Sequence, residues 1–206
     1  GGTIAGRAAS AQDNVGYRSA QLGVADLLQA VPGADMLAIE GEQVAQLDSK
    51  DMDAATWQRL ASRVAHHLAR PEVRGLVVTH GTDTLEETAW LLQRVLAPQK
   101  PVVLTAAMRP ATSLQADGPQ NLADALVVAA ADGAAGVLAV LAGRVLAAGD
   151  VRKVHSWRLD AFDAGDAGPV AAIEQGRLRL WRPWPTGQAL GLARLAGDAA
   201  DWPWVE

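Results

Sequence analysis

The chain has 206 residues, 50% of them hydrophobic, and a formal net charge of −5 at pH 7. This length and apolar fraction suit one large α/β domain with a sizeable core. The negative charge argues against a sequence-independent nucleic-acid surface. Cysteine is absent, which excludes a disulfide framework and a thiolate metal site. No apolar run is long enough to span a bilayer, so we expect no membrane segment.

The first third of the chain mixes loops with short predicted elements. Residues 1–6 form a glycine-punctuated opening, and the small polar residues that follow, up to Arg18, indicate a surface loop. Residues 23–30 predict a short helix, and residues 36–47 alternate loosely enough for one or two strands. A longer helix ends before Pro71. Its apolar face consists of Trp57, Leu60, Ala61, Val64 and Leu68.

Three short apolar runs predict the buried strands of a parallel sheet. They cover residues 76–78, 101–105 and 136–141. Helices are predicted between them, followed by a return strand at 145–151 and a hairpin at 170–180. Strands that alternate with helices indicate right-handed crossovers. We therefore predict an α/β fold: a doubly wound, mostly parallel sheet with flanking helices, in a flavodoxin-like arrangement.

The turn after the first of these strands contains more polar residues than a turn needs. The strand breaks at Gly81, and Thr84 and Glu87 have the spacing of a capping box that starts a helix. Open α/β sheets bind their ligands at such turns, at the carboxyl ends of parallel strands. Because the cap leaves Thr82 and Asp83 unused, these two are the first candidates for chemistry.

Three separated polar groups remain as candidates for catalysis: Thr3 with Tyr17, Thr82 with Asp83, and Lys153. No metal-ligand spacing, P-loop or nucleophile elbow occurs. A threonine hydroxyl becomes a nucleophile when a base takes its proton, and a lysine serves as that base where burial lowers its pKa. From the residues alone, the Thr-Asp pair is also compatible with an ordinary turn, and Lys153 with a solvated surface charge.

Several segments resemble the signature motifs of the bacterial-type L-asparaginases, a family that includes the glutaminase-asparaginases. The main ones are Gly1–Gly6, His80–Thr88 and Ala107–Pro110. Supporting pieces follow in family order: Gly41–Val44, Ser49–Met52, Ala116–Pro119 and Asp150–Lys153. The resemblance extends to about Gly176, and Glu86–Glu87 is similar to the type II branch. It implies the N-terminal catalytic domain of such an enzyme.

The resemblance implies a role for each candidate catalytic residue. Thr3 would be the nucleophile that attacks a side-chain amide and forms an acyl-enzyme. Tyr17 would hydrogen-bond to Thr3 and help to activate it. Thr82, Asp83 and Lys153 would form a second triad that polarises the nucleophile or the attacking water.

It also implies how a small zwitterionic substrate would be bound. Ser49 and Asp83 would hold the α-carboxylate and the α-ammonium, while backbone N–H groups at Gly81 and Thr82 would suit an oxyanion hole. One departure from the family pattern is Lys50, where many type II members have glutamine near that ammonium. A cation there would repel that ammonium unless Lys50 turns away or pairs with Asp48 or Asp51.

The remaining expectations concern organisation. Residues 1–180 would be the catalytic domain, preceded in the family by an apolar strand, and residues 181–206 a linker toward a smaller C-terminal domain. No cofactor and no metal are expected. The family forms homotetramers, built as dimers of dimers, and a cytoplasmic or periplasmic location would suit it.

Three functional hypotheses follow. The leading one is an amidohydrolase that converts L-asparagine to L-aspartate and ammonia, with a side activity on L-glutamine. The second is an amidotransferase that acts on aminoacyl-tRNA, although the acidic chain lacks a basic stripe for RNA. The third is a non-catalytic relic, which retention of all five catalytic-type residues argues against.

Overall fold

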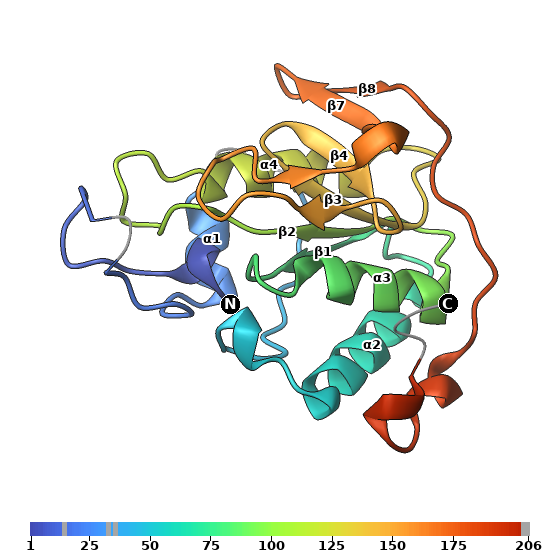
Figure 1. Cartoon of the computed structure of the whole chain (residues 1–206). Helices are drawn as coiled ribbons and strands as arrows, with labels where there is room; N and C mark the ends of the chain where they lie inside the picture. The colour runs from blue at the N-terminus through green and yellow to red at the C-terminus, as the bar shows by residue number, and fades with distance from the viewer. Residues whose placement is uncertain (14–15, 32–33, 35–36, 203–206) are drawn as a thin grey trace.

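The computed structural model describes residues 1–13, 16–31, 34 and 37–202, and its centre is a six-stranded sheet (Figure 1). The strands lie in the order β1–β2–β3–β4–β7–β8. β1, β2 and β3 pair in parallel, whereas the remaining pairs are antiparallel. The bounds are Leu76–Thr79 (β1), Val102–Thr105 (β2), Val137–Leu141 (β3), Arg144–Ala147 (β4), Ala171–Glu174 (β7) and Arg177–Leu180 (β8).

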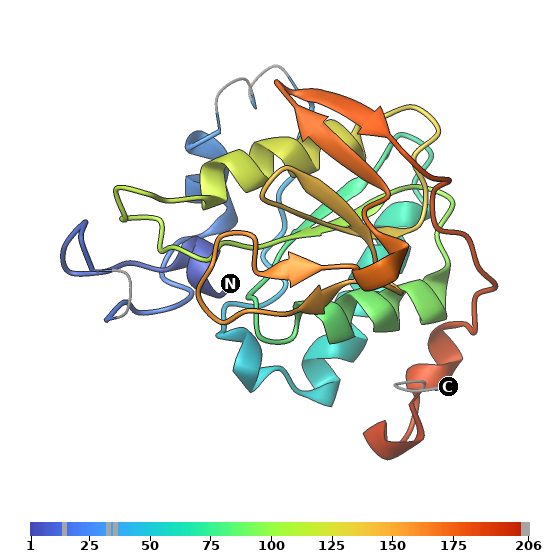
Figure 2. The ribbon, with the colours of Figure 1, turned by 45° about the horizontal axis from the view of Figure 1, so that its top comes forward.

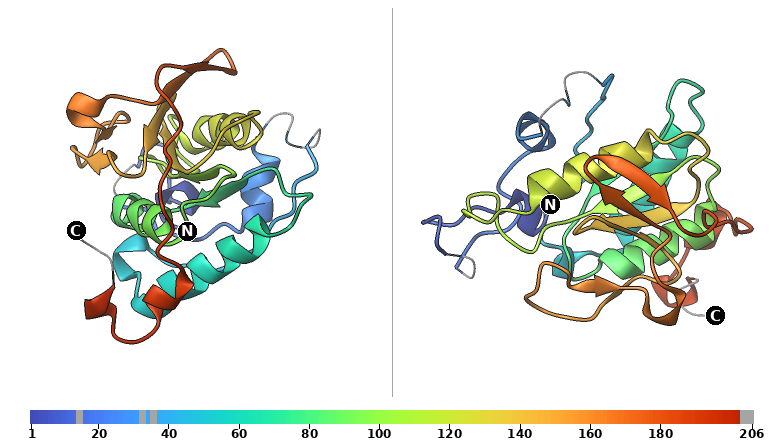
Figure 3. Two further views of the ribbon diagram at one scale, coloured as in Figure 1. Left: turned by 90° about the vertical axis from the view of Figure 1, so that its right-hand side faces the viewer. Right: turned by 90° about the horizontal axis from the view of Figure 1, so that it is seen from above.

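Helices cover both faces of the sheet (Figures 1 and 3). Alternate strand residues divide between the faces: Val102 and Leu104 pack in the cluster with α2 and α3, and Val103 packs in the cluster with α4. The helices are α1 (Val24–Gln29), α2 (Ala54–Leu68), α3 (Leu85–Leu96) and α4 (Gly118–Ala129). The predicted α/β fold with flanking helices is confirmed. No helix in the described ranges is long and apolar enough to cross a membrane.

The sheet is mixed rather than mostly parallel, which corrects that part of the prediction. Two-residue turns, Ala142–Gly143 and Gln175–Gly176, connect β3 to β4 and β7 to β8. All four turn residues have positive φ, between 49° and 72°. Tight turns of this kind match the twist of an antiparallel hairpin and cannot connect parallel strands. Parallel pairing therefore stops at β3, after the last long crossover.

The prediction of strands within residues 36–47 is wrong for 37–47, where the structure has no strand; Met36 lies outside the described residues. The backbone carbonyls of this segment are used in other ways. Leu47 O accepts from the Gly2 N–H at 3.1 Å, and Ala45 O accepts from the Gln43 side chain at 2.6 Å. The loose alternation of the sequence thus reflects an extended segment with one side facing the protein, without a ladder partner.

A largely apolar cavity of about 860 Å³ lies between this segment and β1. Its lining includes Leu22, Leu27, Leu37, Leu60 and residues 76–79, with Gly1 also on its wall. The residues of β1 are only partly buried, whereas every residue of β2 and β3 is buried. The strand expected before Gly1 stays a prediction.

The last described residues run back along the outside of α2 and α3 (Figure 2). Leu195 and Trp202 are buried there, and Gln58 Nε2 donates to Leu195 O at 3.1 Å. This segment contains the short turns η5 (Leu192–Leu195) and η6 (Ala199–Asp201). Its role as a linker stays a prediction, and residues 203–206 lie outside the described part.

Candidate active site

The turn after β1 packs directly against the start of the chain. A Cβ placed on Gly2, whose φ is +65°, would lie 2.3 Å from the Cα of Gly81. A Cβ on Gly81 would in turn lie 2.4 Å from Ser49 Oγ. Both positions therefore require glycine, because a side chain at either would push the two segments apart. This backbone contact brings η1, the short helix Thr3–Ala5, beside the turn that carries Thr82.

Lys153 connects the two polar residues of that turn. Its Nζ donates to Thr82 Oγ1 at 2.8 Å and to Asp83 Oδ1 at 2.7 Å. Thr82 is buried, and the side chain of Lys153 is 22% exposed against 48% for Asp83. An ion pair this accessible contributes little to stability. It fixes the orientation of the lysine toward the buried hydroxyl instead.

The element that carries Lys153 was not visible in the sequence. Residues 152–170 are weakly patterned, yet β5 (Arg152–Lys153) and β6 (Phe162–Asp163) form a separate two-stranded sheet. Phe162 is buried in the core with Ala161, and Arg144 Nη1 bonds Asp163 Oδ2 at 3.0 Å. Strands this short show no periodicity, so only the tertiary contacts reveal them.

Thr3 and Tyr17 form the second polar group. Their side-chain oxygens lie 2.6 Å apart, and Thr3 is buried at the start of η1. The ring of Tyr17 lies against Gly6, where a Cβ would be 2.8 Å from Tyr17 Cδ2. Paired backbone hydrogen bonds between Arg7 and Arg18, both 2.9 Å, close the loop that carries the tyrosine. The structure thus brings the five candidate side chains together in two groups.

Ser49 supports the central turn from a third segment. It is buried at the start of η3 (Ser49–Asp51), and its Oγ accepts a hydrogen bond from the Asp83 N–H at 3.1 Å. The hydroxyl proton of Ser49 stays available for another acceptor, because that contact uses only the oxygen. The site therefore has a hydroxyl donor beside Asp83.

The capping box predicted from Thr84 and Glu87 is wrong. Thr84 is the N-cap residue of α3, but its side chain caps no helical N–H and donates instead to Ser49 O at 2.8 Å. The Ser49 carbonyl accepts from the Met52 N–H at 3.2 Å, and its second lone pair competes with the helix N–H groups for the Thr84 side chain. The residue thereby ties η3 to the turn, which the motif alone did not reveal.

His80, at the end of β1, is a buried structural residue. Its Nδ1 donates to Gly81 O at 2.8 Å, and its Nε2 lies 3.1 Å from Thr88 Oγ1. Because a carbonyl only accepts, Nδ1 carries a proton. Burial lowers the pKa of His80 to about 4, against a smaller opposing effect of the Gly81 hydrogen bond. The ring therefore holds the turn and stays uncharged near neutral pH.

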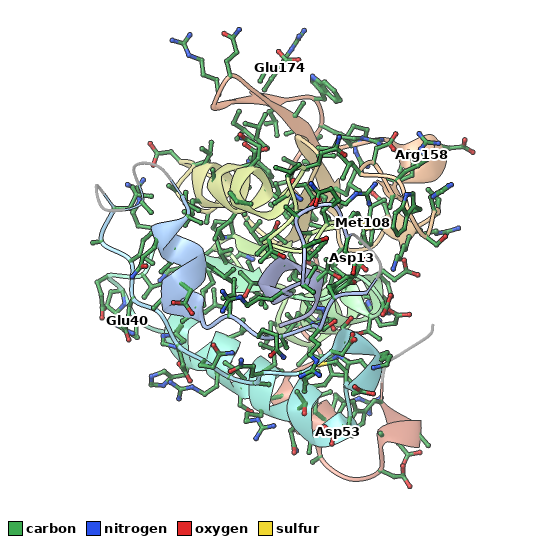
Figure 4. All side chains as sticks on the ribbon, turned by 90° about the vertical axis from the view of Figure 1, so that its left-hand side faces the viewer. Asp13, Glu40, Asp53, Met108, Arg158 and Glu174 are labelled. Carbon is green, nitrogen blue, oxygen red and sulfur yellow. The ribbon has the colours of Figure 1, made fainter. Side chains whose placement is uncertain are left out.

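The motif at residues 107–110 is held by the motif at 116–119. The carboxylate of Asp117 accepts from the backbone N–H groups of Met108 and Arg109, at 2.9 Å each. The guanidinium of Arg109 stacks 4.6 Å from the ring centroid of Trp157 and donates to its carbonyl at 2.9 Å. These contacts reach the loop after Lys153, from which Arg158 projects outward (Figure 4).

Lys50 pairs with its own neighbours, which is one of the two arrangements that would avoid repulsion of the substrate ammonium. Its Nζ lies 3.4 Å from Asp48 Oδ2 and 3.1 Å from Asp51 Oδ2, and its side chain is 62% exposed. These contacts, the hydrogen bond to Asp51 first, raise the pKa of Lys50. Within the described ranges, no three His, Cys, Asp or Glu side chains cluster as metal ligands would.

Known proteins match this chain over most of its length. The family model "Asparaginase, N-terminal" matches residues 1–185. L-asparaginase 2 of Bacillus subtilis is 42% identical over 176 residues, which is 84% of this chain and 47% of that protein. L-asparaginase 2 of Escherichia coli is 41% identical over 185 residues, 88% of this chain and 52% of that protein.

A solved structure is also similar. The crystal structure of a probable cytoplasmic L-asparaginase from Campylobacter jejuni superposes with a TM-score of 0.84 at 39% identity. The match covers 88% of this chain and 56% of that one. The chain thus spans about half the length of the relatives it matches.

Proposed function

Because this chain belongs to the asparaginase family, we propose that its full-length protein hydrolyses L-asparagine to L-aspartate and ammonia. One observation carries the proposal. Two threonine hydroxyls lie on segments in direct contact, one bonded to Tyr17 and the other to Lys153. Amide hydrolysis through a covalent intermediate needs this combination of a nucleophile and a route for its proton.

In the first half of the reaction, Thr3 is the nucleophile. Its Oγ1 attacks the side-chain carbonyl carbon of asparagine, an O–C bond forms, and the C–N bond breaks. Tyr17, 2.6 Å away, takes the hydroxyl proton and passes its own to the departing nitrogen, which leaves as ammonia. The backbone N–H groups of Gly81 and Thr82, in the turn that precedes α3, would stabilise the developing oxyanion.

In the second half, a water oxygen bonds to the carbonyl carbon of the acyl-Thr3 ester and the C–Oγ1 bond breaks, which releases aspartate. The water proton returns to Thr3 Oγ1 by way of Tyr17, 2.6 Å away. Thr82 Oγ1 accepts from the Lys153 ammonium, so its own proton is directed toward the reacting atoms. Asp83 keeps the lysine oriented at 2.7 Å. This half of the site thus holds a hydroxyl and an ammonium in fixed positions beside the ester, where they stabilise developing negative charge. No cofactor takes part.

Substrate binding follows from the same residues. The exposed carboxylate of Asp83 uses one oxygen for Lys153 and has the other for the α-ammonium. The Ser49 hydroxyl, which accepts from Asp83 N–H, donates its proton to the α-carboxylate. Glutamine is one methylene longer and is proposed as a weaker substrate. A homotetramer, built as a dimer of dimers, with substrate as its small-molecule partner, is proposed from the family resemblance.

An ammonia-release assay on the full-length protein, with asparagine and glutamine side by side, tests the proposal. We expect rapid release from asparagine and slower release from glutamine. If neither amide releases ammonia, the proposal is contradicted, and an amidotransferase or a non-catalytic domain is favoured. The substitutions discussed below then assign the residues.

A further inference from the structure

Lys153 lies on a short strand with little support from the rest of the fold. β5 has two residues and pairs only with β6, in a sheet separate from the six-stranded one. The Val154 N–H donates to Ala161 O at 2.8 Å, on the side of β6. Since successive N–H groups of a strand alternate in direction, the Lys153 N–H points away from β6. An acceptor on that side therefore decides where this backbone lies.

Glu86 supplies that acceptor. The Lys153 N–H donates to Glu86 Oε2, a contact between residues 67 positions apart in the chain. Glu86 belongs to the first turn of α3, three positions after Asp83. The helix itself is anchored by buried residues of its apolar face, Leu85, Ala89 and Leu92. One rigid helix start thus holds both ends of the Asp83–Lys153 pair.

We infer that Glu86 is a positioning residue, which sets the backbone of Lys153 so that its ammonium meets Thr82 and Asp83. For its catalytic meaning, this inference rests on the proposed function. The Lys153 contacts are 2.7 and 2.8 Å long, so a shift of about 1 Å takes both beyond hydrogen-bonding range. A misplacement of about 1 Å costs on the order of 100-fold in rate.

Glu87 provides the matched control. It occupies the same helical turn, carries the same charge near the helix N-terminus and is exposed. Any effect that arises from charge and the helix dipole should appear in Glu87→Ala as well as in Glu86→Ala. An effect confined to Glu86 comes from its contact with Lys153.

The kinetic test compares Glu86→Ala, Glu86→Gln and Glu87→Ala in the full-length protein, with asparagine as substrate. We expect kcat of Glu86→Ala to fall about 10- to 100-fold with little change in KM. Glu86→Gln keeps a carbonyl acceptor and should stay within about threefold of the wild type, as should Glu87→Ala. Equal losses in Glu86→Gln and Glu86→Ala, or wild-type kcat in Glu86→Ala, would overturn the inference.

A second measurement is independent of activity. Limited labelling with an amine-selective acylating reagent, followed by peptide mass spectrometry, reports how well the Lys153 ammonium is held. Lys50 and Lys100, the other lysines of the chain, are internal references. We expect faster labelling of Lys153 in Glu86→Ala alone; unchanged labelling in a folded Glu86→Ala protein would contradict the positioning role. A wild type without ammonia release would refute the proposed function but leave this labelling test intact.

Discussion

The two polar groups of the site are built in different ways. Thr82 and Asp83 lie in the short turn between β1 and α3, and Lys153 lies on a short strand that is hydrogen-bonded to α3. Tyr17 lies outside any helix or strand, and its ties are the Arg7–Arg18 bridge, the Gly6 contact and the bond to Thr3. Regular structure thus fixes the first group, and local contacts fix the second.

This difference teaches what each group contributes. A group held by the sheet and α3 is suited to preorganised electrostatics, whose benefit depends on not moving. A group on a loop is suited to access, because loops admit a substrate without disturbing the core. We therefore expect substitutions of Thr82 and Lys153 to act on chemistry alone, and those at Tyr17 to act on chemistry and binding.

The largest effects are expected from the two hydroxyls. Thr3→Ala and Thr82→Ala should each lower kcat by at least about 10³-fold, equivalent to roughly 4 kcal/mol of transition-state stabilisation. Both variants should remain folded, since each substitution removes only one hydroxyl and one methyl group. Thr3→Ser and Thr82→Ser keep the hydroxyls and serve as controls in the ammonia assay. Near-native turnover by either alanine variant would break the assignment.

Acid should weaken the turn that supports Thr82, because His80 is buried neutral. Its pKa is about 4 in the fold and 6.5 when exposed, so between these values the unfolded chain binds a proton that the native state does not. The stability contribution is complete above pH 6.5 and is lost as the pH falls toward 4. The loss amounts to roughly 3 kcal/mol.

Denaturant unfolding of wild type and His80→Gln at several pH values measures this effect. The difference in free energy of unfolding between the wild type and His80→Gln should fall by most of that amount between neutral pH and pH 4. A constant difference between the two proteins would show that His80 titrates in the fold as it does in water.

Removal of the Tyr17 hydroxyl should have an intermediate effect. Tyr17→Phe keeps the ring against Gly6 but loses the bond to Thr3, so kcat should fall about 10- to 100-fold while KM changes little. Tyr17→Ala also removes the ring, and its KM should rise in addition. Steady-state kinetics separate the two, and full activity in Tyr17→Phe would remove the tyrosine from the proton route.

The sequence predicted the parts of this molecule where burial imposes a period. β1, β2 and β3 were found because each is a short continuous apolar run, and α2–α4 because their apolar residues repeat every third to fourth position. β5 and β6 were missed, since two-residue strands carry no period. The contact between Glu86 and Lys153 was missed because it joins residues 67 positions apart. The spacing of the local motif assigns the Thr84 hydroxyl to a helix cap. In the structure this hydroxyl donates to the Ser49 carbonyl instead, which only the tertiary fold brings near.

The smallest effect is expected at Lys50, next to Ser49. Its ammonium is engaged by Asp48 and Asp51 and exposed to solvent, where such ion pairs are worth roughly 0–1 kcal/mol. Lys50→Gln should therefore change KM for asparagine by no more than about twofold, as should the distant Lys100→Gln. A lysine facing the substrate ammonium would behave differently, because its removal would lower KM by a factor that shrinks with added salt. KM measured at low and high ionic strength distinguishes these cases, and a salt-sensitive gain in Lys50→Gln alone would show that the lysine faces the site.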